Sequence, residues 1–125
     1  MTGVLVVTRY VVPGEEAAAF AEQARTALDA LRARPGCRAA VLGRAADDET
    51  LWTLTTRWDS VGSYRRALGS FEVKLHAVPL MYRAVDEPTA FEELLAWEPD
   101  AGLVSSEPSR APDADAAAPE GFTDR

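Results

Sequence analysis

The sequence predicts an α+β fold of the ferredoxin-like split type, in which the order βαββαβ places two helices on one face of a four-stranded antiparallel sheet. Three observations support it. Residues 4–12 are almost continuously β-branched or apolar, as in a strand. Residues 37–45 and 50–58 are two extended runs joined by a short polar connection, which indicates an antiparallel hairpin. Helical periodicity follows both the first strand and the hairpin, and a chain of 125 residues has room for one such domain.

The first strand ends at Pro13 and Gly14, and the two acidic residues that follow suit the positive end of a helix dipole. A helix of about twenty residues is expected next, because apolar side chains recur on one face at helical spacing. These are Phe20, Ala24, Ala27, Leu28 and Leu31. The triplet Arg34-Pro35-Gly36 ends this helix.

The second strand of the hairpin alternates between two faces, one of which is largely aromatic. That face carries Trp52, Leu54, Thr56 and Trp58. Asp59-Ser60 then supplies an N-cap for a second helix, whose apolar stripe includes Tyr64 and which Gly69-Ser70 weakens or ends. The fourth strand is predicted at Leu80–Val85, opened by Pro79.

The predicted domain covers residues 1–98, and residues 99–125 form a disordered acidic tail rich in Ala, Pro, Asp and Ser. Within the domain, residues 90–97 carry too few apolar side chains to cover the sheet face that the helices leave free. We therefore predict a homodimer in which the two sheets face each other and this segment crosses onto the partner.

Charge and cysteine usage exclude several classes of function. The chain has 13 basic and 20 acidic residues and no clustered basic surface, so nucleic acid is not expected as a partner. No apolar run is long enough to span a membrane, and the first residues do not resemble a signal peptide. With Cys37 as the single cysteine and one histidine, no internal disulfide or usual zinc site is possible, and a cytoplasmic location is expected.

Several of these segments together resemble the antibiotic biosynthesis monooxygenase family of the dimeric α+β barrel proteins. The resemblance extends from Met1 to about Trp97. It is carried by the opening strand Val4–Val12, the helix end at residues 34–37, the strand-to-helix junction at residues 52–60, and Phe71 with His76 after the second helix. Proteins of this kind include cofactor-free monooxygenases that oxidise anthrones, quinol oxygenases, haem-degrading enzymes and members without assigned activity.

The resemblance implies a pocket between the sheet and the helices. Its candidate catalytic residues are Tyr64, His76 and Arg83, and its candidate substrate-binding residues are Thr8, Arg9, Trp52 and Trp58. Tyr64 or His76 would serve as a hydrogen-bond partner or base, an arginine would hold a phenolate, and Trp52 would stack on a flat ring. The expected activity is cofactor-independent oxygenation of a polycyclic aromatic metabolite of anthrone or quinol type, with no cofactor and no metal.

Other interpretations stay open. The same scaffold can serve as a non-catalytic small-molecule binding or accessory protein, or as a cyclase or isomerase that uses the pocket for proton transfer. Haem degradation is less favoured, because His76 alone has a counterpart among the residues that the haem-degrading relatives use. Each candidate also has a structural alternative: the tryptophans as core packing, His76 as an ordinary helix-end histidine, and Arg9 and Arg83 as surface or interface charges.

Overall fold

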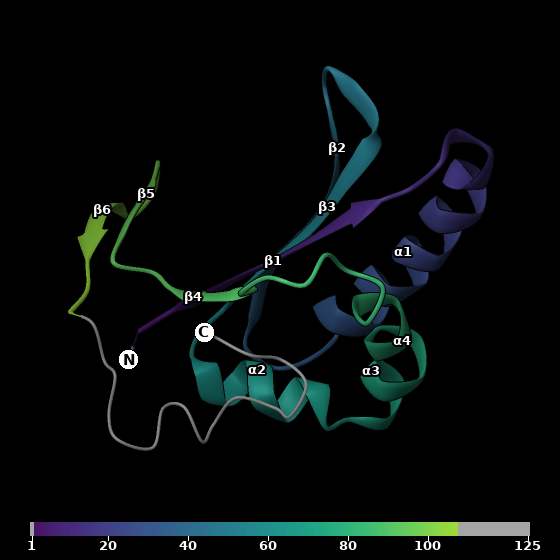
Figure 1. The fold of residues 1–125 in the computed structure, drawn as a ribbon. Helices are drawn as coiled ribbons and strands as arrows, with labels where there is room; N and C mark the ends of the chain where they lie inside the picture. The colour runs from purple at the N-terminus through teal and green to yellow at the C-terminus, as the bar shows by residue number, and fades with distance from the viewer. Residues whose placement is uncertain (1, 108–125) are drawn as a thin grey trace.

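The computed structural model describes residues 2–107, which form a four-stranded sheet, a layer of helices on one side of it and a separate two-stranded hairpin (Figure 1). The strands are β1 (Val4–Val11), β2 (Cys37–Ala45), β3 (Asp48–Trp58), β4 (Ala90–Glu92), β5 (Leu95–Glu98) and β6 (Gly102–Ser105). The helical elements are the 3-10 turn η1 (Gly14–Glu16) and the helices α1 (Ala17–Arg32), α2 (Val61–Leu68), α3 (Phe71–His76) and α4 (Val78–Met81). Within residues 2–107, no helix has the length and apolar character needed to cross a bilayer.

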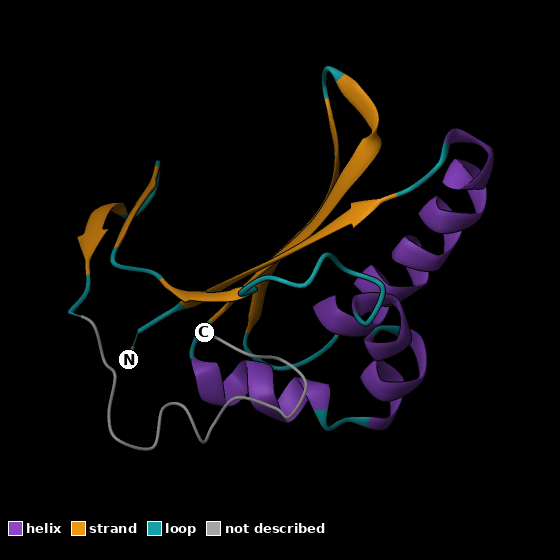
Figure 2. Cartoon of the chain, in the orientation of Figure 1, coloured by secondary structure: helices purple, strands orange, loops and turns teal. Residues whose placement is uncertain are grey.

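The main sheet has the strand order β2-β3-β1-β4, and every neighbouring pair is antiparallel (Figure 2). Thr8 of β1 and Leu42 of β2 both lie opposite Leu54 of the central strand β3. This arrangement, with the helices on one face, confirms the predicted ferredoxin-like α+β class. The predicted hairpin of β2 and β3 is also confirmed.

The fourth strand lies later in the chain than predicted. Residues 78–81 form α4, with a proline in its first turn, and Leu80 and Met81 are buried in the core. Strand β4 begins only at Ala90 and pairs with β1. The prediction of a strand at Leu80–Val85 was wrong because a short apolar run behind a proline suits the first turn of a helix as well as an edge strand.

The second helix ends at Gly69, as predicted, and the chain restarts as α3 after Ser70. Ser60 is the N-cap of α2, and its Oγ accepts a hydrogen bond from the backbone nitrogen of Ser63 at 3.1 Å. The cap fixes the first turn of α2 against the end of β3. It therefore determines where Tyr64, one turn into the helix, meets the sheet.

The hydrophobic core lies between the helices and one face of the sheet. Alternate residues of β1 and β3 point into it and are buried: Val4, Val6, Thr8, Tyr10, Trp52, Leu54, Thr56 and Trp58. The apolar face of α1 covers them with Phe20, Ala24, Ala27 and Leu31. The buried faces are those that the period of two in the strands and the period of 3.6 in the helix predict.

The ordered chain continues past the predicted domain boundary at residue 98. Strand β6 pairs with β5 in register from Leu95 opposite Ser105 to Glu98 opposite Gly102. A disordered tail beginning at Pro99 is thus contradicted for the residues of this hairpin. The remainder of the predicted tail, residues 108–125, lies outside the described residues.

Candidate functional site

A cluster of buried hydroxyl groups lies between the sheet and α2. The Tyr10 hydroxyl donates a hydrogen bond to Thr8 Oγ1 at 2.9 Å, and Thr8 Oγ1 donates in turn to the backbone oxygen of Leu54 at 3.2 Å. The Tyr64 side chain approaches from α2, and its ring lies 5.6 Å from the ring of Trp58. All four side chains that form the cluster and its wall are almost fully buried: Thr8, Tyr10, Trp58 and Tyr64. Thr8, Tyr10 and Tyr64 carry the hydroxyl groups, and Trp58 is the wall beside them. We call these four residues the hydroxyl cluster.

Two polar atoms in this region are buried without a hydrogen-bond partner among the described residues. They are the Tyr64 hydroxyl and Trp52 Nε1. A buried polar group without a partner costs about 1–3 kcal/mol, so each such group calls for an explanation. A ligand oxygen between the helix layer and the sheet would provide one.

The two tyrosines of the cluster are neutral at physiological pH. Burial, and to a smaller extent the nearby Tyr10 hydroxyl, raises the pKa of Tyr64 well above its usual value. Burial also raises the pKa of Tyr10, although its hydrogen bond to Thr8 and the charge of Arg83 act in the opposite direction. Tyr64 therefore offers a free hydroxyl hydrogen bond, whereas Tyr10 already donates its own to Thr8, and both groups would be poor bases.

An aromatic row continues from the cluster along the inner face of the sheet. The Phe20 ring lies 5.1 Å from Tyr10 and 5.3 Å from Trp52, the latter in an edge-to-face arrangement. The guanidinium carbon of Arg44 lies 5.5 Å from the centre of the Trp52 ring. Trp52 and Trp58 are thus at opposite ends of one strand face and do not share a single pocket wall.

Sequence reasoning missed Tyr10 as a member of the site. Its position was visible, because it follows Thr8 by two residues and so points to the same face of the strand. The hydrogen bond between the two hydroxyls makes Tyr10 part of the cluster as directly as Thr8.

Arg9 does not reach the cluster, although it was predicted with Thr8. As a neighbour of Thr8 in the strand it points to the opposite face, where its guanidinium lies 3.6 Å from Glu87. The expectation that Arg9 lines the same pocket as Tyr64 therefore fails because of strand alternation.

His76 and Arg83 also lie away from the hydroxyl cluster. His76 is the last residue of α3, and its Nε2 lies 3.6 Å from Glu72 Oε1 one turn earlier. Arg83 follows α4 and donates to Gln23 Oε1 at 2.7 Å, and its guanidinium carbon lies 5.6 Å from the centre of the Phe20 ring. The charge of Arg83 acts to lower the pKa of Tyr10.

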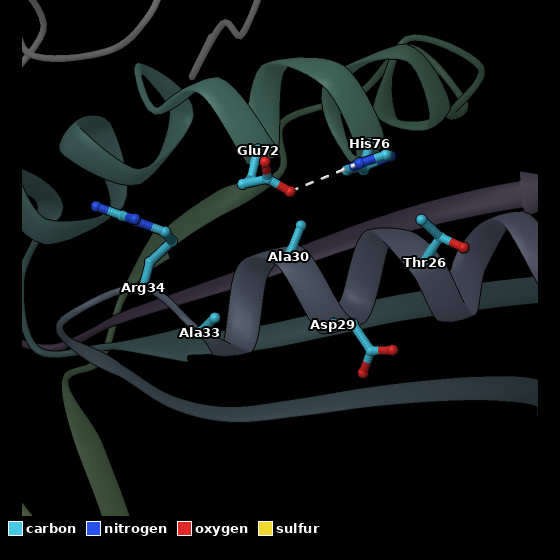
Figure 3. Close-up of a pocket in the computed structure, with 7 residues that line it drawn as sticks. All are labelled: Thr26, Asp29, Ala30, Ala33, Arg34, Glu72 and His76. Carbon is cyan, nitrogen blue, oxygen red and sulfur yellow. Dashed lines mark ion pairs between the residues drawn. The ribbon is translucent and has the colours of Figure 1, made fainter.

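His76 instead lines a shallow groove between α1 and the α3–α4 segment. One lobe has a volume of about 270 Å³ and the next about 380 Å³, and Thr26 and His76 line both. Figure 3 shows Glu72 and His76 facing Ala30 across the first lobe, while Asp29 points away from them. Within residues 2–107, no group of three or more His, Cys, Asp or Glu side chains is placed to hold a metal ion.

Comparisons with known proteins agree with this fold. A family model described as antibiotic biosynthesis monooxygenase matches residues 3–77. No curated protein sequence matches the chain significantly.

Several solved structures superpose on most of the chain. A mutant of SnoaB, a cofactor-independent oxygenase from Streptomyces nogalater, is 20% identical with a TM-score of 0.58, covering 86% of this chain and 96% of that protein. A conserved protein from Methanosarcina mazei is 19% identical with a TM-score of 0.61, covering 74% and 92% respectively. A monooxygenase assigned to antibiotic biosynthesis in Deinococcus radiodurans is 20% identical with a TM-score of 0.61, covering 72% and 91%. At these identities the likeness establishes the shared fold.

Proposed function

The chain belongs to the antibiotic biosynthesis monooxygenase family, and from this premise we propose that it is a cofactor-independent monooxygenase that acts on an electron-rich polycyclic aromatic metabolite of anthrone or quinol type. The observation that carries the proposal is the Tyr64 hydroxyl, which is buried between helix and sheet without a partner among the described residues. It lies beside a second tyrosine hydroxyl and against the Trp58 ring. This combination suits a flat ring that carries an oxygen atom.

The proposed chemistry needs dioxygen and the substrate alone. The anion of an anthrone can give an electron to dioxygen directly, after which a carbon–oxygen bond forms at the ring carbon. One oxygen atom stays on that carbon as a ketone, the other leaves as water, and the water takes up the two hydrogens that the carbon loses. The substrate is oxidised by the dioxygen that is reduced, so no external reductant is required.

The protein would stabilise the substrate anion. Tyr64 would donate a hydrogen bond to the anionic ring oxygen, Tyr10 and Thr8 would hold the hydroxyl network in place, and Trp58 would pack against the ring. The raised pKa of Tyr64 favours the role of donor over that of base. Because Tyr64 and Trp58 fill the space around the cluster, α2 must shift for a substrate to reach it.

Oxygen uptake tests this proposal. Metal-stripped wild-type protein is mixed with a panel of anthrones and quinols in an oxygen electrode, beside Tyr64→Phe and, as a matched control, Tyr82→Phe at an exposed tyrosine. We expect catalysed uptake with the wild type and the control, and a loss of at least tenfold in kcat for Tyr64→Phe. Uptake no faster than the uncatalysed reaction for every substrate, with folded protein, would refute the oxygenase proposal.

A second candidate is a non-catalytic binding or accessory protein for the same class of metabolite. The observation that favours it is the chemistry of the cluster: the Tyr64 hydroxyl is free to donate a hydrogen bond, and both tyrosines have raised pKa values that suit them poorly as bases. Such a site can hold an aromatic ligand without turnover. Quenching of tryptophan fluorescence by an anthrone, weakened by Tyr64→Phe and without oxygen uptake, would select this function.

We also propose that the working unit is a homodimer. The sheet face opposite the helices carries exposed apolar side chains, including Val11 at 68% and Val41 at 58% exposure. Exposed apolar surface of this kind commonly marks a protein interface.

A further inference from the structure

The groove between α1 and the α3–α4 segment has an arginine in each of its two lobes. Arg34 lines the lobe of about 270 Å³, and Arg83 lines the lobe of about 380 Å³. Thr26 and His76 line both lobes, so the lobes adjoin each other along α1. Figure 3 shows Arg34 at one end of the first lobe and Thr26 with His76 at the other. Two adjoining lobes of this size have room for one small-molecule ligand.

Arg34 makes no ion pair with another side chain of residues 2–107. It follows the last turn of α1, where the negative end of the helix dipole favours a cation. Its Nε is buried, however, and has no hydrogen-bond partner in the described part of the chain. A buried donor of this kind calls for an acceptor, and a carboxylate along one edge of a guanidinium group contacts Nε and one Nη together.

The acidic side chains of the first lobe already have partners. Asp29 accepts a hydrogen bond from Arg32 Nε at 2.9 Å and points away from Glu72 and His76 in Figure 3. Glu72 faces His76, with 3.6 Å between Oε1 and Nε2. Arg34 is therefore the charged group of this lobe that is left for a ligand.

Arg83, in the second lobe, is held in place and keeps most of its hydrogen-bond donors. It donates through Nη1 to Gln23 Oε1 at 2.7 Å, and its guanidinium carbon lies 5.6 Å from the centre of the Phe20 ring. Its contact with Glu16 is looser, at 3.9 Å. A guanidinium group has five N–H donors, so Arg83 can still bind a carboxylate through two of them.

The surface between the two arginines is uncharged or apolar. No acidic side chain of residues 2–107 lines the second lobe, and its apolar wall consists of Leu75, Pro79 and Leu80. In the first lobe, Ala30 and Ala33 leave space along α1 because their side chains are small. A hydrocarbon chain can lie along this surface, with its acidic ends at the arginines.

The distance along α1 sets the length of such a ligand. Arg83 is bonded to Gln23, and a helix rises about 1.5 Å per residue, so Gln23 and Arg34 lie about 16 Å apart along the helix axis. We propose that the groove binds an elongated organic dicarboxylate, with one carboxylate on Arg34, the other on Arg83 and an apolar chain between them. This site is separate from the hydroxyl cluster and independent of the oxygenase reaction.

Isothermal titration calorimetry of the full-length protein tests the site. The ligands are straight-chain dicarboxylates of about six to sixteen carbon atoms, each compared with the monocarboxylate of the same length. We expect the affinity of the dicarboxylates to pass through a maximum at one length. At that length the dicarboxylate should bind at least tenfold more tightly than the monocarboxylate, because only the dicarboxylate reaches both arginines.

Charge-removing variants identify the two ends of the site. Arg34→Gln and Arg83→Gln should each lower the affinity for the best dicarboxylate to that of the monocarboxylate. Arg65→Gln is the matched control, because Arg65 is an exposed arginine of α2 that lines neither lobe. It should bind both ligands as the wild type does.

A variant that fills the groove provides a second measurement in case Arg83→Gln does not fold. Thr26→Phe alters an exposed position shared by both lobes and keeps both arginines, so it should abolish binding. Equal affinities of dicarboxylate and monocarboxylate at every length, wild-type binding by Thr26→Phe, or no binding at millimolar concentration would overturn the site. Oxygen uptake is measured separately, so these outcomes leave the oxygenase proposal standing.

Discussion

The buried Tyr64 hydroxyl is expected to lower the free energy of unfolding, and a single substitution can measure this effect. It is buried and has no hydrogen-bond partner among the described residues. Tyr64→Phe removes the hydroxyl and keeps the ring packed on Trp58, so we expect the free energy of unfolding to rise by about 1 kcal/mol. Urea denaturation followed by circular dichroism measures this change. A more stable but less active protein is the pattern expected where a functional group is kept at the expense of stability.

Tyr10→Phe is the matched control. Its hydroxyl donates to Thr8, so the same substitution should lower the free energy of unfolding by about 1 kcal/mol. A destabilised Tyr64→Phe variant would show that the Tyr64 hydroxyl is satisfied in the folded protein and would remove the main support for a ligand oxygen beside it.

At the scale of single residues, alternation in the strands made part of the site predictable. Thr8, Trp52 and Trp58 fall on the inner face by counting in twos, and the Ser60 cap places Tyr64 against that face. His76 and Arg83 could not be placed this way. Their directions depend on where the helical segment after Ser70 turns at Ala77 and enters α4, which short-range sequence patterns do not specify.

At the scale of elements, the sequence predicted the strands and helices that have long periodic patterns. β1, α1, β2 and β3 have at least eight residues each, and buried residues recur regularly in β1, α1 and β3. The last strands are only three or four residues long, and the pairing partner across the sheet decides their conformation. This explains why β4 was placed too early and β6 was assigned to a tail.

The turn between α1 and β2 gives a prediction about contacts between elements. Gly36 has a φ of +90°, and a Cβ atom there would lie 2.5 Å from Ser63 Oγ in α2. Gly36→Ala therefore combines backbone strain with a steric clash, and we expect a loss of about 3 kcal/mol in the free energy of unfolding. Thermal denaturation should show a correspondingly lower Tm.

Gly14→Ala is the control for this substitution, because a Cβ at Gly14 would meet no atom within 4 Å. We expect its Tm to stay close to that of the wild type. Equal Tm values for the two variants would contradict the close approach of α2 to this turn.

At the scale of the whole molecule, the sequence indicated that one sheet face needs a cover but not how the C-terminal segment is held. The Arg57 network joins β3 to Glu93, just before β5, and to Glu98, the last residue of β5, over about forty positions of sequence. Ion pairs between such distant residues leave no local pattern in the sequence. The way in which the β5–β6 hairpin is held to the sheet was therefore visible only in the folded chain.

The same network predicts how stability depends on pH. The hydrogen bonds from Arg57 hold the pKa of Glu93 below its usual range, so the folded state binds this proton less readily than the unfolded chain does. The stabilisation is fully present above the unfolded pKa of about 4.3 and is lost as pH falls through the lower folded pKa. Glu93→Gln should therefore cost on the order of 1 kcal/mol in the free energy of unfolding at pH 7, and this difference from the wild type should shrink below about pH 4.

Urea denaturation of the wild type and Glu93→Gln between pH 3 and pH 7 measures this difference at low protein concentration, where dissociation of a dimer does not contribute. Glu22→Gln, at an exposed carboxylate of α1, is the control and should follow the wild type at every pH. Because Glu93 also holds the base of the β5–β6 hairpin to the sheet, acrylamide should quench Trp97 differently in Glu93→Gln and in the wild type at neutral pH, and this contrast should fade in acid. A stability difference between Glu93→Gln and the wild type that is constant across the pH range would mean that the Glu93 charge does not hold the β5–β6 hairpin to the sheet.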